Sequence, residues 1–283
     1  MTAERVALIT GASSGFGLLT CVTLAGRGWR VLATMRDPAR REKLDAAASA
    51  AGVAERIEVH ALDVTNAEQI AALVDVVAVR SLRVDAVINN AGFALAGFAE
   101  DTTDAELRRQ FETNFFGATA VTRAFLPLLR RQRSGHIVMI SSVSGRMGFP
   151  GLGSYAASKF ALEAWTETLR MEVESLGIEV VLIEPGAFET DIWGRNAIVS
   201  EGTMDAKSPN AERIARWRKR FENPKVRPDA QEVANAIARV LDDPKPKLRY
   251  VFGPDAKMGL RMRRWLPWSI YERMVIKGSG IDG

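Results

Sequence analysis

Seven short runs of apolar, largely β-branched residues constrain the fold of this chain more than any other feature. They occupy residues 6–10, 30–35, 57–62, 84–89, 136–141, 178–183 and 248–252, and segments with helical periodicity, such as 107–129 and 156–176, lie between them. Strands that are apolar on both faces and alternate with helices form a parallel sheet covered on both sides. The pattern therefore predicts a doubly wound α/β fold, in which ligands bind beyond the carboxyl ends of the strands.

Composition indicates one soluble domain. The 283 residues are 47% hydrophobic and 25% charged, and no linker-like break divides them. Cys21 is the single cysteine, which excludes an intrachain disulfide and fits a reducing compartment. Because it lies in a predicted helix after a glycine-rich turn, we expect its side chain to be buried in the core. No run approaches the roughly 18 to 20 apolar residues of a membrane-spanning helix, and the N-terminus lacks the pattern of a signal peptide. We therefore expect a cytoplasmic protein.

A glycine-rich turn follows the first predicted strand. The segment T-G-A-S-S-G-F-G, residues 10–17, places Gly11, Gly15 and Gly17 between that strand and a helix. Glycines let the backbone approach a diphosphate closely, and the helix N-terminus directs free N–H groups and a positive dipole end at the anion. The spacing G-x-x-x-G-x-G differs from the G-x-G-x-x-G dinucleotide fingerprint, so a plain structural turn is the alternative.

The end of the second predicted strand indicates which dinucleotide would bind. NAD is usually recognised by an acid that binds the ribose 2'-hydroxyl, whereas a 2'-phosphate needs a cation. Met35 cannot bind a diol and Arg36 can bind a phosphate, so NADP(H) is favoured over NAD(H), although Asp37 follows directly. A solvated charge is the alternative for Arg36.

The third and fourth predicted strands end in further candidate nucleotide contacts. Asp63 and Val64 follow the third strand, near the expected adenine. Asp63 is equally compatible with capping a helix that begins near Thr65. The segment N-N-A-G, residues 89–92, ends in small residues that allow close approach of a ligand.

Tyr155 and Lys159 lie four residues apart near the start of a predicted helix, so both address one pocket. A tyrosine with a pKa of about 10 is a poor base at neutral pH, and a nearby ammonium, helped by an oxidised nicotinamide, favours the phenolate. An accidental Y-x-x-x-K is the alternative. The fifth strand ends at Ser141 and Ser142, where a serine hydroxyl can hold a substrate oxygen that Tyr155 protonates or deprotonates.

The motifs occur in an order that resembles a known family. T-G-x-x-x-G-x-G, N-N-A-G, Asn114 on a helix, S-S thirteen residues before the tyrosine, Y-x-x-x-K and P-G-x-x-x-T together resemble the short-chain dehydrogenase/reductases, over roughly residues 4–255. R-D-P-A-R, S-K-F-A-L-E and E-P-G-A-F look most like the branch with 17β-hydroxysteroid and retinol dehydrogenases. The resemblance implies a Rossmann-type, seven-stranded parallel sheet with helices on both faces, in a single domain over 1–255. It also implies NADP(H)-dependent interconversion of a carbonyl and an alcohol, and homodimers or homotetramers that pair through 107–129 and 156–176.

The resemblance also implies roles for individual residues. Tyr155 would be the acid/base and Ser142 the donor to the substrate oxygen, with Ser141 as the alternative serine. Lys159 would be the electrostatic partner and a ligand of the nicotinamide ribose, and Asn114 would anchor a proton-relay water. The implied cofactor-binding residues are Gly11, Ser13, Ser14, Gly15, Phe16, Gly17, Arg36, Asp63, Val64, Asn90, Ala91, Gly92, Tyr155, Lys159, Pro185, Gly186, Phe188 and Thr190.

Within that set, Ser13 and Arg36 would bind the 2'-phosphate. Pro185, Gly186 and Thr190 would hold the nicotinamide carboxamide. Phe188 stands where family members often have a smaller aliphatic residue, which puts the local nicotinamide contacts in doubt.

The substrate is expected to be apolar. The segment 187–228 has no clear strand and is expected to be a lid over the cofactor. The apolar loop residues at this edge are Phe93, Leu95, Phe98, Met147, Phe149, Leu152, Phe188, Ile192 and Trp193. They favour a hydrophobic carbonyl or alcohol, with loop packing as an equal alternative for each. Carbonyl reduction is the expected direction, because cellular NADP pools are usually reduced.

The C-terminal part of the chain is basic. Residues 207–283 carry 18 Lys and Arg against 9 Asp and Glu, whereas residues 1–206 carry 20 against 25. The extension 256–283 interleaves cations with apolar residues over 257–277, as an interfacial amphipathic helix does. Packing on its own domain or on a second subunit is favoured over contact with a membrane surface. Nucleic acid is not expected as a partner, because no binding module accompanies the charge.

Two other functions are compatible with the same fold. A nucleotide-binding regulatory protein would not need Asn114, Ser142, Tyr155 and Lys159 together, and an epimerase or dehydratase using transient hydride transfer usually has another glycine spacing. Neither histidine lies near other metal-ligand types in the sequence, so no metal site is predicted.

Overall fold

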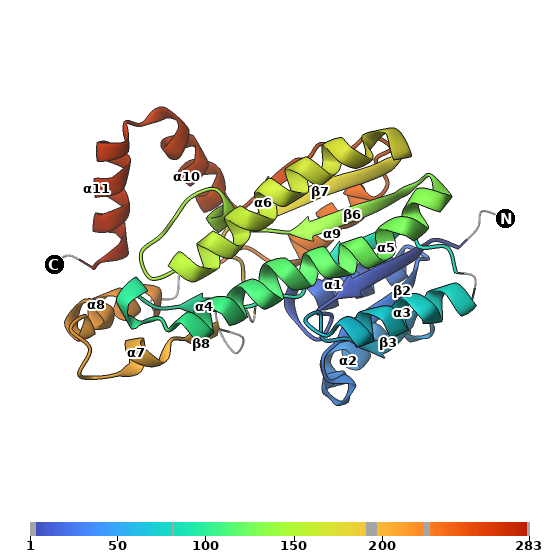
Figure 1. Cartoon of the computed structure of the whole chain (residues 1–283), viewed down its shortest axis with the longest axis horizontal. Coiled ribbons are helices and arrows are strands. Elements are labelled where there is room, and N and C mark those ends of the chain that lie inside the picture. Colours follow the sequence, from blue (N-terminus) through green and yellow to red (C-terminus); the bar gives the residue numbers. More distant parts are fainter. Residues whose placement is uncertain (1–3, 81, 191–196, 223–226, 282–283) are drawn as a thin grey trace.

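A seven-stranded parallel sheet runs through the computed structural model, which describes residues 4–80, 82–190, 197–222 and 227–281 (Figure 1). Its strands are β1 (Val6–Thr10), β2 (Arg30–Met35), β3 (Ile57–Ala61), β4 (Ala86–Asn89), β6 (Gly135–Ile140), β7 (Ile178–Pro185) and β9 (Arg249–Phe252). Their order is β3-β2-β1-β4-β6-β7-β9, so the winding reverses between β1 and β4. Such a switch point is where doubly wound sheets bind ligands. The predicted fold class and all seven predicted strands are confirmed.

Helices cover both faces of this sheet. On one face lie α1 (Gly15–Gly26), α2 (Glu42–Ala50) and α9 (Gln231–Val240), and on the other lie α3 (Ala67–Val79), α5 (Ala118–Gln132) and α6 (Gly153–Val173). Each face buries its own apolar cluster, one including Cys21 and Leu24, the other Phe125 and Leu162. Strands with apolar residues on both faces are stable only between two such layers, which explains their continuous hydrophobic runs. Cys21 is fully buried, as expected.

The predicted helix over 107–129 is interrupted. The structure has α4 (Asp104–Phe111), a π-helical segment (Glu112–Gly117) and then α5. Hydrophobic periodicity does not reveal an extra residue in a helical turn, so the sequence indicated one continuous helix. π-helical turns occur frequently at functional sites, and this one contains Asn114.

The prediction of no strand in the segment after Pro185 is wrong. A short strand, β8 (Ala197–Val199), pairs with β5 (Ala94–Ala96) in a separate two-stranded parallel sheet, and α7 (Glu201–Met204) and α8 (Ala211–Glu222) follow. Three residues are too few to show a strand period in a sequence. Residues Ile192 and Trp193, expected near the substrate, lie outside the described residues.

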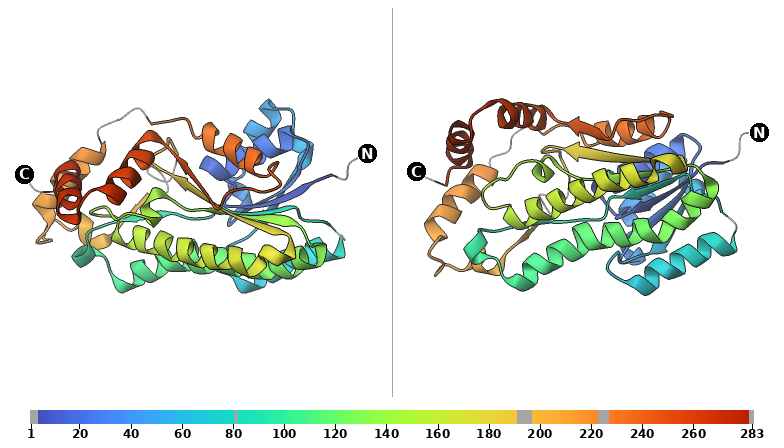
Figure 2. Two further views of the ribbon diagram at one scale, coloured as in Figure 1. Left: turned by 90° about the horizontal axis from the view of Figure 1, so that it is seen from above. Right: turned by 45° about the horizontal axis from the view of Figure 1, so that its top comes forward.

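The C-terminal extension forms two helices, α10 (Pro254–Trp265) and α11 (Trp268–Ser279), separated at Pro267. They lie with α8 at one end of the molecule, beyond the carboxyl ends of the strands (Figures 1 and 2). Their inner side packs on the domain: Ala256 and Tyr271 are buried with Met147, and Ile281 is buried with Trp217. Within the described residues, no helix is both long and apolar enough to cross a membrane.

Candidate active site

The glycine-rich turn is held tightly against the segment that follows β4. Gly11 and Gly15 have φ values of 69° and 55°, in the region that favours glycine. The Asn90 side chain donates from Nδ2 to the carbonyl oxygens of Thr10 and Gly11, each over 2.9 Å. A Cβ on Gly17 would lie 2.4 Å from that Nδ2 atom, so only glycine fits there. The turn therefore needs its glycines for close packing as well as for access to a ligand.

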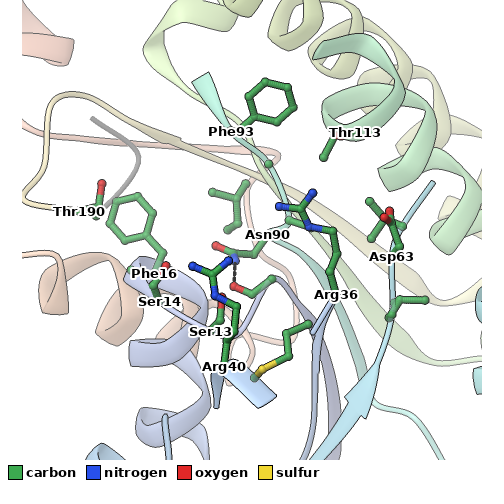
Figure 3. Close-up of a pocket in the computed structure, with 18 of the residues that line it drawn as sticks. Ser13, Ser14, Phe16, Arg36, Arg40, Asp63, Asn90, Phe93, Thr113 and Thr190 are labelled. Atoms are coloured by element: carbon green, nitrogen blue, oxygen red, sulfur yellow. Dashed lines mark hydrogen bonds between the residues drawn. The ribbon is translucent and has the colours of Figure 1, made fainter. Parts of the chain in front are cut away.

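A cavity of about 520 Å³ opens beside this turn along the carboxyl edge of the sheet (Figure 3). All residues that the sequence predicted as cofactor-binding line it, except Gly17, whose position is fixed by packing. Of the four predicted catalytic residues, Ser142, Tyr155 and Lys159 line the cavity and Asn114 does not. The structure adds residues that the sequence did not single out, among them Arg40, Lys43, Arg109, Thr113 and Ile198.

Two arginines border the cavity at the end of β2. Arg36 and Arg40 are both exposed, and Figure 3 shows their side chains bordering the same cavity as Ser13. A 3₁₀ turn over Pro38–Arg40 brings the second arginine back toward the first. Asp37 caps this turn, because its Oδ1 accepts a hydrogen bond from the Ala39 N–H over 3.0 Å. The side chain of Asp37 is therefore engaged by its own turn, and in this part of the lining the cations Arg36, Arg40 and Lys43 outnumber the acids Asp37 and Glu42.

Asp63 lines the cavity and also orders its own loop. Its Oδ1 accepts hydrogen bonds from the N–H and the hydroxyl of Thr65, over 2.9 and 2.8 Å. The cap of α3 is Asn66, whose side chain accepts from Gln69 N–H. The helix-cap alternative for Asp63 is therefore wrong. Its side chain closes a local turn with Thr65, the residue that precedes the cap Asn66.

Tyr155 and Ser142 meet at the other end of the cavity. Tyr155 comes from the first turn of α6 and is 3% exposed, while Ser142 follows β6 and is 6% exposed. Burial raises the pKa of Tyr155 to about 12, and a hydrogen bond with the Ser142 side chain has a smaller, opposite effect. Ser142 Oγ also accepts from the Ser144 N–H over 3.1 Å, which fixes its position. The phenol is therefore neutral here and available as a proton donor.

Lys159 lies one helical turn after the tyrosine and is 5% exposed. Its Nζ donates to the carbonyl oxygen of Ile140 over 2.8 Å and lies 5.9 Å from the centre of the Tyr155 ring. Burial lowers the pKa of Lys159 to about 8. Burial of the phenol is the largest influence on the pKa of Tyr155 in this structure, so the net shift is upward. The effect of the ammonium together with an oxidised nicotinamide stays a prediction.

Asn114 supports the wall of the cavity from behind. It is 1% exposed, and its amide forms two hydrogen bonds with the backbone of Phe93, accepting from N–H over 3.1 Å and donating to C=O over 3.0 Å. It also donates to Ser158 Oγ over 3.3 Å, one helical turn from the tyrosine. The amide thus connects the segment after β4 to α6.

A buried charge cluster behind Lys159 was not predicted. Glu163 and Glu184, 5% and 0% exposed, both lie 3.1 Å from Arg249 Nε, and Arg146 lies 3.2 Å from Glu184. Burial raises the pKa of both carboxyls, and the charge of Glu184 adds to the effect on Glu163. Glu163, Glu184 and Arg249 come from α6, β7 and β9, and Arg146 comes from the loop between β6 and α6, so only the folded chain brings them together.

Most apolar loop residues expected near a substrate pack elsewhere. Phe93 and Phe188 line the cavity, and Phe188 packs edge-on against Phe16, with 5.8 Å between ring centres. The others that the structure describes, Leu95, Phe98, Met147, Phe149 and Leu152, are absent from the lining, and the last four pack beneath α8, α10 and α11. His60 and His136 lie in β3 and β6, and no cluster of metal-ligand residues occurs in the described part of the chain.

Comparison with known proteins places this geometry in context. A family model described as short chain dehydrogenase matches residues 5–198. An uncharacterized oxidoreductase of Bacillus subtilis, YusZ, is 39% identical over 279 residues, which are 97% of this chain and 98% of that protein. Retinol dehydrogenase 8 of Homo sapiens is 38% identical over 257 residues, 87% of this chain and 81% of that protein.

Solved structures agree in fold. A short-chain dehydrogenase from Streptomyces avermitilis is 36% identical with a TM-score of 0.78, covering 96% of this chain and 99% of that one. An alcohol dehydrogenase from Thermococcus sibiricus, complexed with 5-hydroxy-NADP, is 25% identical with a TM-score of 0.70 over 88% and 96% of the two chains. A short-chain dehydrogenase from Burkholderia phymatum, complexed with NAD, is 26% identical with a TM-score of 0.76 over 92% and 93%. Such neighbours support a nicotinamide cofactor and do not select between its two forms.

Proposed function

Because this chain belongs to the short-chain dehydrogenases, we propose that it is an NADP(H)-dependent oxidoreductase that interconverts a carbonyl and an alcohol on a hydrophobic small molecule. One observation carries the proposal: a single cavity has Tyr155, Ser142 and Lys159 at one end and Arg36 and Arg40, which follow β2, at the other. Tyr155 and its neighbours can transfer a proton to a substrate oxygen, and the two arginines can bind a phosphate group.

The cavity residues fit a phosphorylated dinucleotide. The glycine turn and the start of α1 would hold the diphosphate, and Arg36, Arg40 and Ser13 would hold the 2'-phosphate. Lys159 would bind the nicotinamide ribose, and the turn at Pro185 and Gly186 with Thr190 would bind the carboxamide. When bound, the nicotinamide supplies the hydride chemistry, and the protein supplies position and protons.

Tyr155 is the proposed acid/base. In the reducing direction its neutral hydroxyl, together with the hydroxyl of Ser142, holds the carbonyl oxygen and then gives up its proton as that oxygen becomes an alcohol. The raised pKa of the buried phenol keeps it protonated at neutral pH, as a proton donor in the reducing direction must be. In the oxidising direction the same group must first lose that proton.

Lys159 and Asn114 act on this proton donor from two sides. The ammonium of Lys159 stabilises the phenolate left after proton transfer. Asn114 does not reach the cavity, so we propose it as a positioning residue that holds Phe93 and α6 in place. Its predicted role as anchor of a relay water remains a proposal.

An apolar substrate is supported by two observations. Phe93, Phe188 and Ile198 are apolar residues that line the cavity. The similarity to retinol dehydrogenase 8 also favours a hydrophobic alcohol or aldehyde.

A panel of hydrophobic aldehydes and ketones, followed by NADPH absorbance, tests the proposal. We expect net NADPH oxidation with at least one member and a markedly weaker response with NADH. A regulatory protein would bind NADPH without net consumption, and an epimerase or dehydratase would convert substrate without it. Either result would contradict the proposed reaction.

A further inference from the structure

Each of the helices α10 and α11 exposes cations and large apolar side chains on its outer side, while its inner side packs on the domain. We propose that this outer side binds peripherally to the surface of an anionic phospholipid membrane. The proposal goes beyond the reaction above and does not depend on it. We call this side the basic outer face; it consists of Lys257, Met258, Arg261, Arg264 and Trp265 of α10 and Ile270, Arg273, Met274 and Lys277 of α11.

Helical spacing places these residues on one side of each helix. In α10, positions 257, 258, 261, 264 and 265 follow the i, i+3, i+4 pattern, and in α11 positions 270, 273, 274 and 277 do so. All nine are exposed. Each helix therefore presents a surface in which apolar side chains alternate with cations.

The inner sides of both helices already have partners. Ala256 and Tyr271 are buried against Val143 and Met147, and Leu260 and Val275 pack on the same cluster. The Asp255 side chain at the start of α10 accepts a hydrogen bond from the Ala187 N–H over 2.9 Å. These contacts of the inner sides fix the orientation of both helices, and the residues of the basic outer face are not needed to complete the domain core.

The exposed apolar groups on these helices are unusually concentrated. Among the described residues, 5 of the 11 exposed large hydrophobic side chains lie in α10 and α11, and Trp265 is the most exposed of these five at 75%. Trp268, at 57%, borders the face between the two helices. The guanidinium of Arg264 lies 5.3 Å from the Trp265 ring and that of Arg263 lies 4.8 Å from the Trp268 ring. Indole rings beside cations are well suited to the boundary between lipid headgroups and acyl chains.

The positive charge of the basic outer face indicates which kind of partner it binds. Residues 257–277 contain six Lys and Arg against one Glu. A two-fold contact between copies of this chain would place the basic outer face against itself, with like charges opposed. A nucleic acid would satisfy the cations but not the exposed Trp, Ile and Met side chains. An anionic lipid surface accepts both kinds of group.

The dimensions agree with binding on the surface of a membrane. Each helix has 12 residues, about 18 Å of length, whereas a helix that spans a bilayer needs about 20 residues. Both helices lie beyond the carboxyl edge of the sheet, the edge that carries the cavity (Figure 2). Lipid binding would therefore bring the cavity close to apolar molecules dissolved in the membrane.

Flotation of the full-length protein with phosphatidylcholine vesicles, with and without phosphatidylglycerol, tests this inference. We expect binding only to the anionic vesicles, and weaker binding as salt is added. Replacing Arg261 and Arg264 together by Gln should lower vesicle affinity about 30-fold, since each cation near such a surface contributes about fivefold. Trp265→Ser should also lower it, and should abolish a blue shift of tryptophan emission on vesicle addition.

A matched variant provides the control. Arg239→Gln with Lys245→Gln removes the same charge from exposed positions away from the extension and should float like the wild type. Thermal melts and NADPH binding confirm that each variant is folded. Equal flotation of all variants would overturn the inference, as would absence of flotation. It would also be overturned if the face instead mediated self-association or bound duplex DNA or RNA without binding vesicles.

Discussion

At the scale of single residues, the charge on Lys159 beside Tyr155 determines how the proposed reaction responds to pH. Burial raises the pKa of this phenol to about 12, so the donor is protonated throughout the neutral range. Burial lowers the pKa of Lys159 to about 8, so its charge is present below that pH and is lost above it. The group that gives the proton and the group that stabilises the product phenolate are thus both in the required state below about pH 8.

The pH profile of kcat follows from these states. We expect kcat for carbonyl reduction to be level below about pH 7, to reach half of that value near pH 8 and to fall further above it as Lys159 loses its proton. The Lys159→Gln variant should be slower throughout and should lack this alkaline decline. A wild-type rate that instead rises steadily above pH 8 would show that the charge on Lys159 does not assist proton transfer.

A second prediction at this scale concerns cofactor preference and the two arginines that follow β2. Arg36→Ala and Arg40→Ala should each raise KM for NADPH about tenfold, as expected for loss of one charge-assisted phosphate contact, and leave KM for NADH unchanged. Arg41→Ala is the matched control, because Arg41 pairs with Asp45 and does not line the cavity. An equal effect on both cofactors would mean that these arginines do not contact a 2'-phosphate.

Sequence alone identified Arg36 but not Arg40, and it identified Tyr155 but not the carboxyl pair behind Lys159. The difference is physical. Arg36 and Tyr155 belong to local motifs, whereas Arg40 reaches the cavity only through the turn capped by Asp37, and Glu163 meets Glu184 only when α6 packs on β7. Burial likewise decides the pKa of Tyr155, and a spacing pattern does not report burial.

At the scale of secondary-structure elements, the junction between β1 and α1 is the part most sensitive to added atoms. A Cβ at Gly17 would meet Asn90 Nδ2 and the Gly11 carbonyl oxygen, each at 2.4 Å, whereas nothing lies within 4 Å of a Cβ at Gly26. Both glycines belong to α1, at its start and at its end. The same substitution therefore has opposite consequences within one helix.

Gly17→Ala should displace Asn90, lower the melting temperature and weaken NADPH binding at least tenfold. Gly26→Ala should leave binding unchanged and stabilise the protein by about 0.5–1 kcal/mol, because alanine has the higher helix propensity. Differential scanning calorimetry and NADPH titration measure both effects. If Gly17→Ala bound NADPH normally, the tight packing of this turn would not be required for the site.

Elements with a strong period were predicted well, and short or irregular ones were not. All seven strands of the main sheet follow from their apolar runs; the five inner strands are largely buried on both faces, and the edge strands β3 and β9 are only partly buried. The π-helical segment around Asn114 and the three-residue strands β5 and β8 leave no periodic trace, since each is shorter than two helical turns.

At the scale of the whole molecule, exposed apolar side chains also occur on the helices that cover one face of the sheet. Phe116 is 50% exposed and Phe160 is 46% exposed, on the π-helical segment and on α6, which lie side by side (Figures 1 and 2). Members of this family generally oligomerise. We propose that this surface, and not the basic outer face, joins subunits into a homodimer or homotetramer.

Phe116→Ser combined with Phe160→Ser should shift the protein toward monomer in light scattering after size exclusion, since the two rings lose apolar burial at the interface. Trp265→Ser, at an exposed position on the basic outer face, should leave the mass unchanged. The opposite pattern would assign the subunit contact to the C-terminal helices.

The proposed function depends on whether the Tyr155 hydroxyl transfers the proton. Tyr155→Phe removes one oxygen atom from a buried ring and leaves the cationic end of the cavity intact. With any carbonyl substrate that the wild type reduces, turnover by Tyr155→Phe should fall at least about a hundredfold, the lower range for loss of a general acid. NADPH affinity, measured by fluorescence titration, should change less than about threefold. Wild-type turnover in this variant with NADPH still bound would contradict the proposed role of Tyr155.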